Sequence, residues 1–379
     1  MAGMPSPYQV IPIKGGSTNY TYRIICACSS AKKSDQSSTA QTTMIIKYAP
    51  PYAVITPNIP FTPERQEFEA FAMQELALAL RRLASTTIVT LPRLIFHDRT
   101  NHILAMEDVG LDATSSEKKQ ETSTISLKDF CKSSSITSND ITVADRVGTE
   151  LGKFLFGLHH CGRSIGLSES DKLRETFVRN AAARQLDVDT TFGDILRNLD
   201  EFQVTYSADE KRILERLIQE TSFEIMNNFE TIIMGDFWYG NILLKFQTGA
   251  ELRDLTQIGV IDWEFTTCGP LFVDLAHFAS EIWLQDRFHL NNGLASIANR
   301  KAAVSLFASY RACGGYIDCK KIALYIGGHV CCFLRFTNWT DDMEHRKTVA
   351  REAIDLMLAA DSKNWASVNN SFIRELFEL

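Results

Sequence analysis

Short apolar segments separated by glycine and polar turns predict a sheet in the first third of the chain. Five segments rich in β-branched and aromatic residues have the length and composition of strands, namely 8–13, 20–26, 43–47, 91–97 and 102–106. Between the third and the fourth, Phe68, Phe71, Leu76 and Leu80 lie on one apolar helical face of residues 62–84. The pattern predicts a five-stranded antiparallel sheet with one main helix.

After residue 140 the apolar period becomes helical. Val143, Val147, Leu151 and Leu155 recur four residues apart and predict a long helix that Asp140 caps. Further helices are predicted over 174–199, 207–228, 301–312, 319–337 and 345–360. The fold class is therefore α+β, with an N-terminal lobe over 1–110, a polar crossing loop rich in Ser, Thr and Lys over 111–140, and a mainly helical lobe over 141–379.

Charge is unevenly distributed along the 379 residues, whose net charge is −7. Residues 1–110 carry ten Lys and Arg against eight Asp and Glu, and the remainder carries 29 against 38. An N-terminal part of this kind tolerates phosphates, and an acidic C-terminal part attracts cations. No basic tract indicates nucleic acid as a partner.

Several classes of location are disfavoured. The longest nearly uncharged stretch, 322–334, is too short for a bilayer, and the first residues lack a basic segment followed by an apolar run. None of the nine cysteines is spaced Cys-x-x-Cys, which favours free thiols in a reducing compartment. We expect a cytoplasmic protein, a monomer or homodimer, with a small-molecule partner and no membrane or nucleic acid.

Chemistry concentrates in residues 231–265. The apolar runs 242–246 and 257–261 flank a polar loop and predict a β-hairpin. Antiparallel pairing would bring Asn241 and Asp262, at the open ends of these runs, within about 5 Å of each other at the backbone. One oxygen from each could then bind a hard cation such as Mg²⁺.

Asp236 precedes Asn241 by five residues, on a loop bounded by Gly235 and Gly240. In a phosphotransferase loop, an Asp takes the proton of the substrate hydroxyl, an Asn five residues later binds metal, and a second metal-binding Asp follows a hairpin. Two acids at unrelated loop ends are the plain structural alternative. A metal-dependent phosphoester hydrolase would also explain the acids, but not the features of the N-terminal lobe.

The N-terminal lobe has three candidate features for nucleotide binding: a turn that contains glycines, a lysine, and the segment that leaves the last strand. Gly15 and Gly16 precede Ser17, Thr18 and Asn19, which offer donors to phosphate oxygens, although a plain hairpin turn would use the same residues. Lys47 closes the third predicted strand, and we expect Glu69 of the following helix, with Glu67 as the alternative, to aim it at nucleotide phosphates. Backbone groups of residues 106–110 are placed to bond adenine, and Gly110 is a plausible pivot between lobes.

With these motifs laid out, nearly the whole chain resembles the aminoglycoside phosphotransferase and choline kinase superfamily, in particular its methylthioribose kinase-like branch. The resemblance rests on the segments GGSTNYTYRI, IIKYAPP, AMEDVG, VGTELGKFLFGLHHCGR, MGDFWYGNILL and VIDWEFTTCGPLFVDLAHF. It implies a bilobal protein-kinase-like fold and the cofactors ATP and Mg²⁺.

The resemblance also implies roles for individual residues. Asn19 and Lys47 would contact ATP phosphates, and Glu107, Asp108 and Val109 would form the adenine hinge. Asp236 would be the catalytic acid-base residue. The triplet Asp262, Trp263 and Glu264 would stand at the cofactor, with Asn241, Asp262 and Glu264 holding Mg²⁺.

The sequence departs from the family pattern at two positions. Met234 stands where the family usually has a His, and Arg335 is the one arginine found where methylthioribose kinases carry a substrate-binding pair. The single arginine argues against methylthioribose, and the acidic C-terminal part, including Glu281 and Asp286, favours a kinase acting on a hydroxyl of a small, amine-bearing metabolite that Asp236 and Arg335 contact. The alternatives are a kinase of methylthioribose or another small alcohol, and a catalytically idle nucleotide-binding protein, which Met234 supports.

Overall fold

The structure is a computed structural model, and it describes residues 8–13, 16–28, 40–83, 88–110, 123–133, 135–163, 168–247, 254–290, 293–336, 339–368 and 370–378. Its chain divides into two compact units. Unit 1 consists of Met1–Leu78, Ile88–Ser126 and Ile242–Glu264, and unit 2 of Ala79–Thr87, Leu127–Asn241 and Phe265–Leu379. The division differs from the linear one expected from the sequence, because the 242–264 hairpin packs with unit 1.

Unit 1 is organised around an antiparallel sheet, as predicted. Its strands are β1 (Tyr8–Ile13), β2 (Tyr20–Cys28), β3 (Ala40–Tyr48), β7 (Leu94–Asp98) and β8 (Ile103–Glu107), in the order β1-β2-β3-β8-β7. Two short strands, β4 (Tyr52–Ala53) and β5 (Thr56–Pro60), form a separate ribbon. In the register of the large sheet, Lys47 lies opposite Thr21 on one side and Leu104 on the other, which fixes its place in the centre.

The single helix predicted over residues 62–84 is instead built of three pieces. They are α1 (Arg65–Phe71), a turn of π-helix η1 (Ala72–Leu76) and α2 (Ala77–Leu83). Ala70 and Met73 of this segment pack on Leu104 and Met106 of β8, next to Ile45 and Leu94. This apolar contact attaches the helix that carries Glu69 to the sheet that carries Lys47.

The predicted hairpin is confirmed. β11 (Ile242–Gln247) pairs antiparallel with β12 (Asp254–Val260), and Ile242 lies opposite Val260. Two further strands extend it, β9 (Ser123–Ser126) alongside β11 and β6 (Val89–Thr90) parallel to β12. Asp262 therefore lies two residues after a strand whose register is set on both sides.

Unit 2 is mainly helical. Its longer helices are α4 (Ser138–Arg163), α8 (Ala208–Asn227), α9 (Phe272–His289), α10 (Leu294–Ala312), α11 (Cys319–Phe336) and α12 (Met343–Ser362). The shorter elements are α3 (Leu127–Lys132), α5 (Ser168–Phe177), α6 (Ala181–Thr191), α7 (Ile195–Glu201), α13 (Ser371–Phe377), the 3₁₀ turns η2 (Tyr239–Asn241) and η3 (Trp365–Ser367), and the ribbon of β10 (Thr231–Ile233) and β13 (Thr267–Gly269). No helix in the described ranges is both long and apolar enough to cross a membrane.

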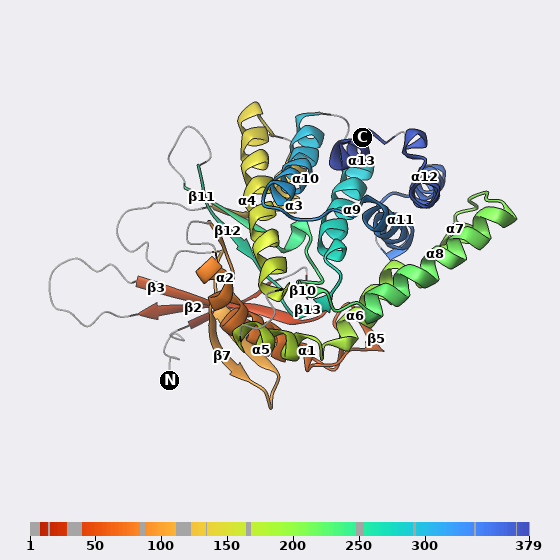
Figure 1. Ribbon diagram of the computed structural model, residues 1–379. Helices are drawn as coiled ribbons and strands as arrows, with labels where there is room; N and C mark the ends of the chain where they lie inside the picture. The colour runs from red at the N-terminus through yellow and green to blue at the C-terminus, as the bar shows by residue number, and fades with distance from the viewer. Residues whose placement is uncertain are drawn as a thin grey trace. The chain divides into compact units, whose positions relative to one another are not determined.

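Two glycines let α4 and α10 lie side by side in the core of unit 2 (Figure 1). A Cβ atom on Gly148 would stand 2.1 Å from the carbonyl oxygen of Ala302, and one on Gly152 would stand 2.4 Å from that of Leu306. The apolar residues predicted for α4 are buried as well. Asp140 lies in the first turn of α4, where its carboxylate accepts from the backbone nitrogen of Thr137 and its own backbone nitrogen donates to Oγ1 of Thr137. Asp140 thus takes part in capping α4, as the third helical residue and not as the residue before the helix.

Candidate active site

Lys47 is the centre of a buried charge cluster in unit 1. Its ammonium nitrogen lies 2.6 Å from Oε1 of Glu69 and 2.6 Å from Oδ1 of Asp262. The structure thus pairs Lys47 with Glu69 and not with Glu67, the choice that spacing alone left open. Lys47 and Glu69 are almost fully buried, whereas 27% of the Asp262 side chain is exposed.

Burial and the neighbouring charges shift the pKa values of the residues in this cluster. Burial acts to lower the pKa of Lys47, but the carboxylates of Asp262, Glu69 and Glu264 outweigh burial and raise this pKa well above its usual value. Burial raises the pKa of Glu69 to about 7 against the opposing charge of Lys47. Asp262 itself has a φ of 70°, a left-handed conformation that is uncommon for a non-glycine residue and concentrates at functional positions.

Glu264 is buried beside this cluster and is fully engaged by protein groups. Its Oε2 accepts from Arg65 at 3.0 Å and from Asn19 at 2.8 Å, and its Oε1 accepts from Thr18 at 2.6 Å. Arg65 also donates to Oδ1 of Asn19 and to the backbone oxygen of Thr18. Asn19 and Glu264, both expected at the cofactor, therefore brace the turn before β2; Gly15 lies outside the described residues.

A cavity of about 400 Å³ lies within unit 1, next to Lys47. Its apolar walls include Ile45 and Met106 of the large sheet and Leu243 of the hairpin. The connector after β8 forms one edge, with Glu107, Asp108, Val109 and Gly110. An apolar slot with a buried cation nearby and a polar backbone edge suits an aromatic ring that carries an anionic group.

The side chains of this connector are held by the protein. Arg23 donates two hydrogen bonds to Asp108, from Nε to Oδ2 at 2.6 Å and from Nη2 to Oδ1 at 3.1 Å. Oε2 of Glu107 accepts from the backbone nitrogen of Arg93. Trp263 is fully buried and donates to the carbonyl oxygen of Val260, so its indole is outside the cavity lining.

The loop that carries Asp236 is shaped by glycines and by Asp274, all within unit 2. Gly235 has a φ of +80°, and a Cβ there would lie 2.5 Å from the carbonyl oxygen of Phe265. Asp274, fully buried at the start of α9, accepts from the backbone nitrogens of Met234 and Gly235, both at 2.9 Å. Asp274 therefore has a structural role, as its position at a helix start predicts.

Asp236 and Asn241 lie in direct contact. Nδ2 of Asn241 donates to Oδ2 of Asp236 at 2.8 Å and to its backbone oxygen at 3.1 Å. On the other side, Nε2 of His277 lies 3.9 Å from Oδ1 of Asp236. The Asp236 carboxylate remains 23% exposed, so it is oriented by protein and still accessible to a substrate.

Arg335, expected at the substrate, lies at an exposed end of α11. It pairs with Glu201 at 3.4 Å and Asp194 at 3.9 Å, both on the segment that forms α7. Nothing within unit 2 places it beside Asp236.

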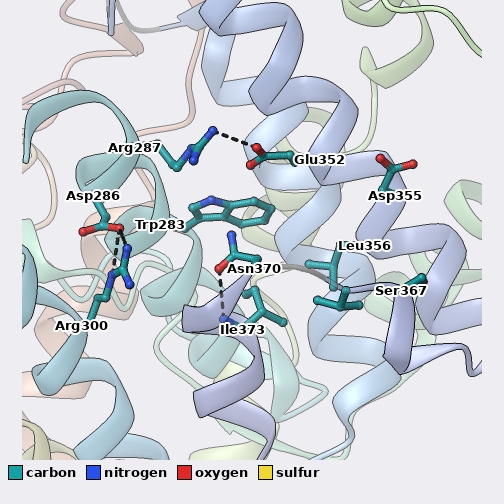
Figure 2. Close-up of a pocket in the computed structure, with 11 residues that line it drawn as sticks. Trp283, Asp286, Arg287, Arg300, Glu352, Asp355, Leu356, Ser367, Asn370 and Ile373 are labelled. Atoms are coloured by element: carbon teal, nitrogen blue, oxygen red, sulfur yellow. Dashed lines mark hydrogen bonds and ion pairs between the residues drawn. The ribbon is translucent and has the colours of Figure 1, made fainter. Parts of the chain in front are cut away.

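A second cavity, of about 330 Å³, lies among α9, α10, α12 and α13 in unit 2 (Figure 2). Figure 2 shows Asp286 turned toward Arg300 and Arg287 turned toward Glu352, at 2.6 and 2.8 Å. Its lining contains none of the predicted site residues. Because Asp286 is neutralised by Arg300, it no longer supports the expectation of a cation-binding surface.

Sequence reasoning missed Arg65, His277 and His329. His277 and Glu281 are four residues apart on α9, a spacing that puts them on one helix face and that was available from the sequence. His329 is on α11, and Arg65 reaches Glu264 across 199 residues. Contacts between such distant segments leave no local signal.

Lys47 with its glutamate, and a glycine-bounded loop that orients Asp236 through Asn241, are parts that phosphoryl transfer requires, and they define a phosphotransferase. The sequence pattern of the phosphotransferase enzyme family matches residues 10–303, and the chain belongs to this family. The resemblance to the aminoglycoside phosphotransferase and choline kinase superfamily is thereby confirmed, and the protein is a small-molecule kinase.

Relatives with recorded activities cover nearly the full length. The chain is 27% identical over 374 residues to the 4-hydroxytryptamine kinase of Psilocybe cyanescens, covering 95% of this chain and 89% of that protein. It is 25% identical over 379 residues to the 4-hydroxytryptamine kinase of Psilocybe cubensis, covering 96% and 91%. Among solved structures, a choline/ethanolamine kinase family protein from Mesorhizobium loti is 12% identical, with a TM-score of 0.43 and coverage of 100% and 95%.

Proposed function

We propose that the protein is an ATP- and Mg²⁺-dependent kinase that phosphorylates a hydroxyl group of a small, amine-bearing acceptor similar to 4-hydroxytryptamine. The observation that carries this proposal is Lys47, held at 2.6 Å by both Glu69 and Asp262 beside a cavity of about 400 Å³. The backbone of residues 107–110 would bond adenine, and Lys47 would compensate the charge of the phosphates.

Asp236 would act on the acceptor. As the acceptor oxygen bonds to the γ-phosphorus, the bond from that phosphorus to the bridging oxygen breaks, ADP leaves, and the hydroxyl proton passes to Asp236. Asn241 fixes one carboxylate oxygen of Asp236 through its Nδ2 and keeps its own amide oxygen as an acceptor. The Asp236 carboxylate is thus oriented by Asn241 before it accepts the proton.

The donor chemistry fits Mg²⁺. Asp262 and Asn241 offer hard oxygen ligands, and in unit 1 Glu69, Asp262 and Glu264 have carboxylate oxygens within 4.8 Å of one another. Burial, and secondly the charge of Asp262, raise the pKa of Glu264, and a divalent cation would offset the repulsion between these two carboxylates. When bound, Mg²⁺ would neutralise charge on the phosphates. Because both oxygens of Glu264 are bonded by protein, we assign metal ligation to Asn241 and Asp262.

The acceptor class is supported by the two relatives named 4-hydroxytryptamine kinase. Glu281 is a nearly buried carboxylate that a chain of contacts through His329 and His277 links to Asp236. An acidic site of this kind disfavours a plain sugar. The lone Arg335, turned toward α7, gives no support to methylthioribose.

The test is a turnover assay with ATP, Mg²⁺ and a panel of 4-hydroxytryptamine, choline, ethanolamine and methylthioribose, read as the mass gain of one phosphoryl group. We expect phosphorylation of hydroxylated amines, and a loss of about 10²-fold or more in turnover for Asp236→Asn. Preference for methylthioribose would overturn the acceptor assignment. Wild-type turnover in Asp236→Asn would overturn the mechanism, and an absence of product and of ATP hydrolysis would indicate an idle nucleotide-binding protein.

A further inference from the structure

His277 is a nearly buried imidazole on α9 that faces Asp236. Its Nε2 lies 3.9 Å from Oδ1 of Asp236, and 11% of its side chain is exposed. It follows Asp274 by three residues, so the helix turn that holds the Asp236 loop also delivers the imidazole. Oδ2 of Asp236 is already bonded by Asn241, which leaves Oδ1 as the oxygen that His277 approaches.

The ring of His277 packs against a side chain of α11. The centroid of the His329 ring lies 4.8 Å away, and Nε2 of His329 lies 3.0 Å from Oε1 of Glu281. His329 is stacked on Phe333 with the rings 3.8 Å apart and 9° from parallel. Each imidazole is therefore fixed by packing before any ligand binds.

The protonation state suits a hydrogen-bond donor. Burial, and secondly the neighbouring His329, lower the pKa of His277 well below its usual value, against a contact with the backbone of Gly235. A neutral imidazole carries a single N–H that it can donate, and the lowered pKa makes its other nitrogen a weak proton acceptor, so His277 does not replace Asp236 as the base. Its Nδ1 is buried and has no hydrogen-bond partner among the described residues, which leaves Nε2 as the nitrogen that faces polar groups.

We propose that His277 is a positioning residue for Asp236, which it orients from α9 with His329 and Glu281 as its support. This inference rests on the proposed function, because it assigns a partner to the catalytic carboxylate. At 3.9 Å the contact is longer than a hydrogen bond, and catalytic hydrogen bonds of this kind often tighten only when substrate is bound. With Asn241 on one oxygen and His277 on the other, the carboxylate plane is held at two points.

Met234 occupies a position from which the loop of Asp236 could itself have supplied a hydrogen-bond donor. Met234 is fully buried two residues before Asp236, and its thioether cannot donate a hydrogen bond. The loop itself therefore supplies no imidazole to the carboxylate. On α9, His277 brings an imidazole nitrogen to 3.9 Å from Oδ1 of Asp236.

The experiment compares His277→Gln, whose amide nitrogen can replace Nε2 as a donor, with His277→Leu, which cannot donate. With the best acceptor from the panel, we expect kcat of His277→Leu to fall by about 10²-fold, the effect of misplacing a catalytic group by about 1 Å. We expect His277→Gln to recover at least half of this loss on a logarithmic scale. The KM for ATP should change less than about twofold in both variants, since His277 acts on the acceptor side.

Several results would overturn the proposal. They are an unchanged kcat in His277→Leu, an equal loss in the Leu and Gln variants at unchanged melting temperature, and an effect confined to the KM of the acceptor, which would make His277 a substrate contact. A stoichiometric transition metal found in the purified protein would also overturn it, because His277, Glu281 and His329 would then be ligands. If His277→Leu does not fold, His329→Phe, which keeps the stacked ring but not the bond to Glu281, should still lower kcat without changing the KM for ATP.

The Asp236→Asn variant distinguishes a failure of the proposed function from a failure of the positioning role of His277. If that variant loses turnover while His277→Leu does not, the proposed function stands and the positioning role is wrong. If Asp236→Asn retains turnover, the proposed function itself fails, whatever the His277 variants do.

Discussion

Replacing Lys47 by methionine removes the positive charge at the centre of unit 1 and keeps a side chain of similar length. Glu69, whose side chain is 1% exposed, then has no counter-ion, whereas Asp262 keeps access to water with 27% exposure. Removing one partner of a buried ion pair costs about 3–5 kcal/mol. We expect Lys47→Met to lower the free energy of unfolding by that amount, chiefly through Glu69.

The loss should depend on pH. The pKa of Glu69 is about 7 in the folded protein, above the ordinary value of about 4.3, so the folded state binds the extra proton between these values and this group weakens stability as pH rises through that range. Without Lys47, whose charge lowers this pKa, the range extends to higher pH. The destabilisation by Lys47→Met should therefore be smaller at pH 6, where Glu69 can protonate, than at pH 8.

Urea denaturation of the wild type, Lys47→Met and Lys47→Met/Glu69→Leu at pH 6, 7 and 8 tests this reasoning. The double variant replaces the pair with apolar groups and should recover most of the stability, since such replacements are often neutral. Its kinase activity should remain as low as that of Lys47→Met, because no charge faces the phosphates. Three results would refute the assignment of Lys47 and Glu69 as a buried ion pair. They are a destabilisation by Lys47→Met of less than about 1 kcal/mol, a destabilisation that becomes smaller as pH rises, and a double variant no more stable than the single one.

Three further variants test the loop of Asp236 and one helix of unit 2. Gly235→Ala should reduce kcat and lower stability by about 1–3 kcal/mol, because φ is +80° and the new Cβ would lie 2.5 Å from the oxygen of Phe265; steady-state kinetics and thermal melting measure both. Asp274→Ala leaves the buried amide of Met234 without an acceptor at about 1–3 kcal/mol, and the half-buried amide of Gly235 at a smaller cost; Asp274→Asn, which retains one acceptor oxygen, should lose less in a denaturant titration. Ser207→Ala removes the capping box of α8 and should cost about 1 kcal/mol in stability with unchanged kcat.

The sequence predicted those features that depend on local pattern. The alternating and continuous apolar runs located all five strands of the large sheet, and the polar loop between residues 246 and 257 located the hairpin. Its register differs by one residue from the expected pairing, since Ile242 lies opposite Val260 and the ladder shifts between Lys245 and Phe246. The loop of Asp236 was recognisable because a short spacing between Asp236 and Asn241 is itself the signal. In the structure these two side chains do touch.

Features built from distant or very short segments were not predictable. The ribbon of β10 and β13 has three residues in each strand, and β6 has two, which is too short for a period to be visible. The π turn in the predicted helix over 62–84 has no Gly or Pro to announce it. Glu69 could be chosen over Glu67 only once the helix was docked on the sheet.

The charges of unit 1 give a physical reason why nucleotide should arrive with a cation. Glu69, Asp262 and Glu264 surround Lys47 and Arg65, so three acids face two bases, and burial together with this crowding raises the pKa of Glu69 and Glu264. Arg65 is held by Glu264 and Asn19, which leaves Lys47 as the base turned toward the cavity. A polyphosphate placed there alone would add negative charge beside carboxylates that already repel one another. A nucleotide that brings a divalent cation would reverse this balance, because the cation would offset the charge of Asp262, to which we assign metal ligation, and of the two carboxylates beside it.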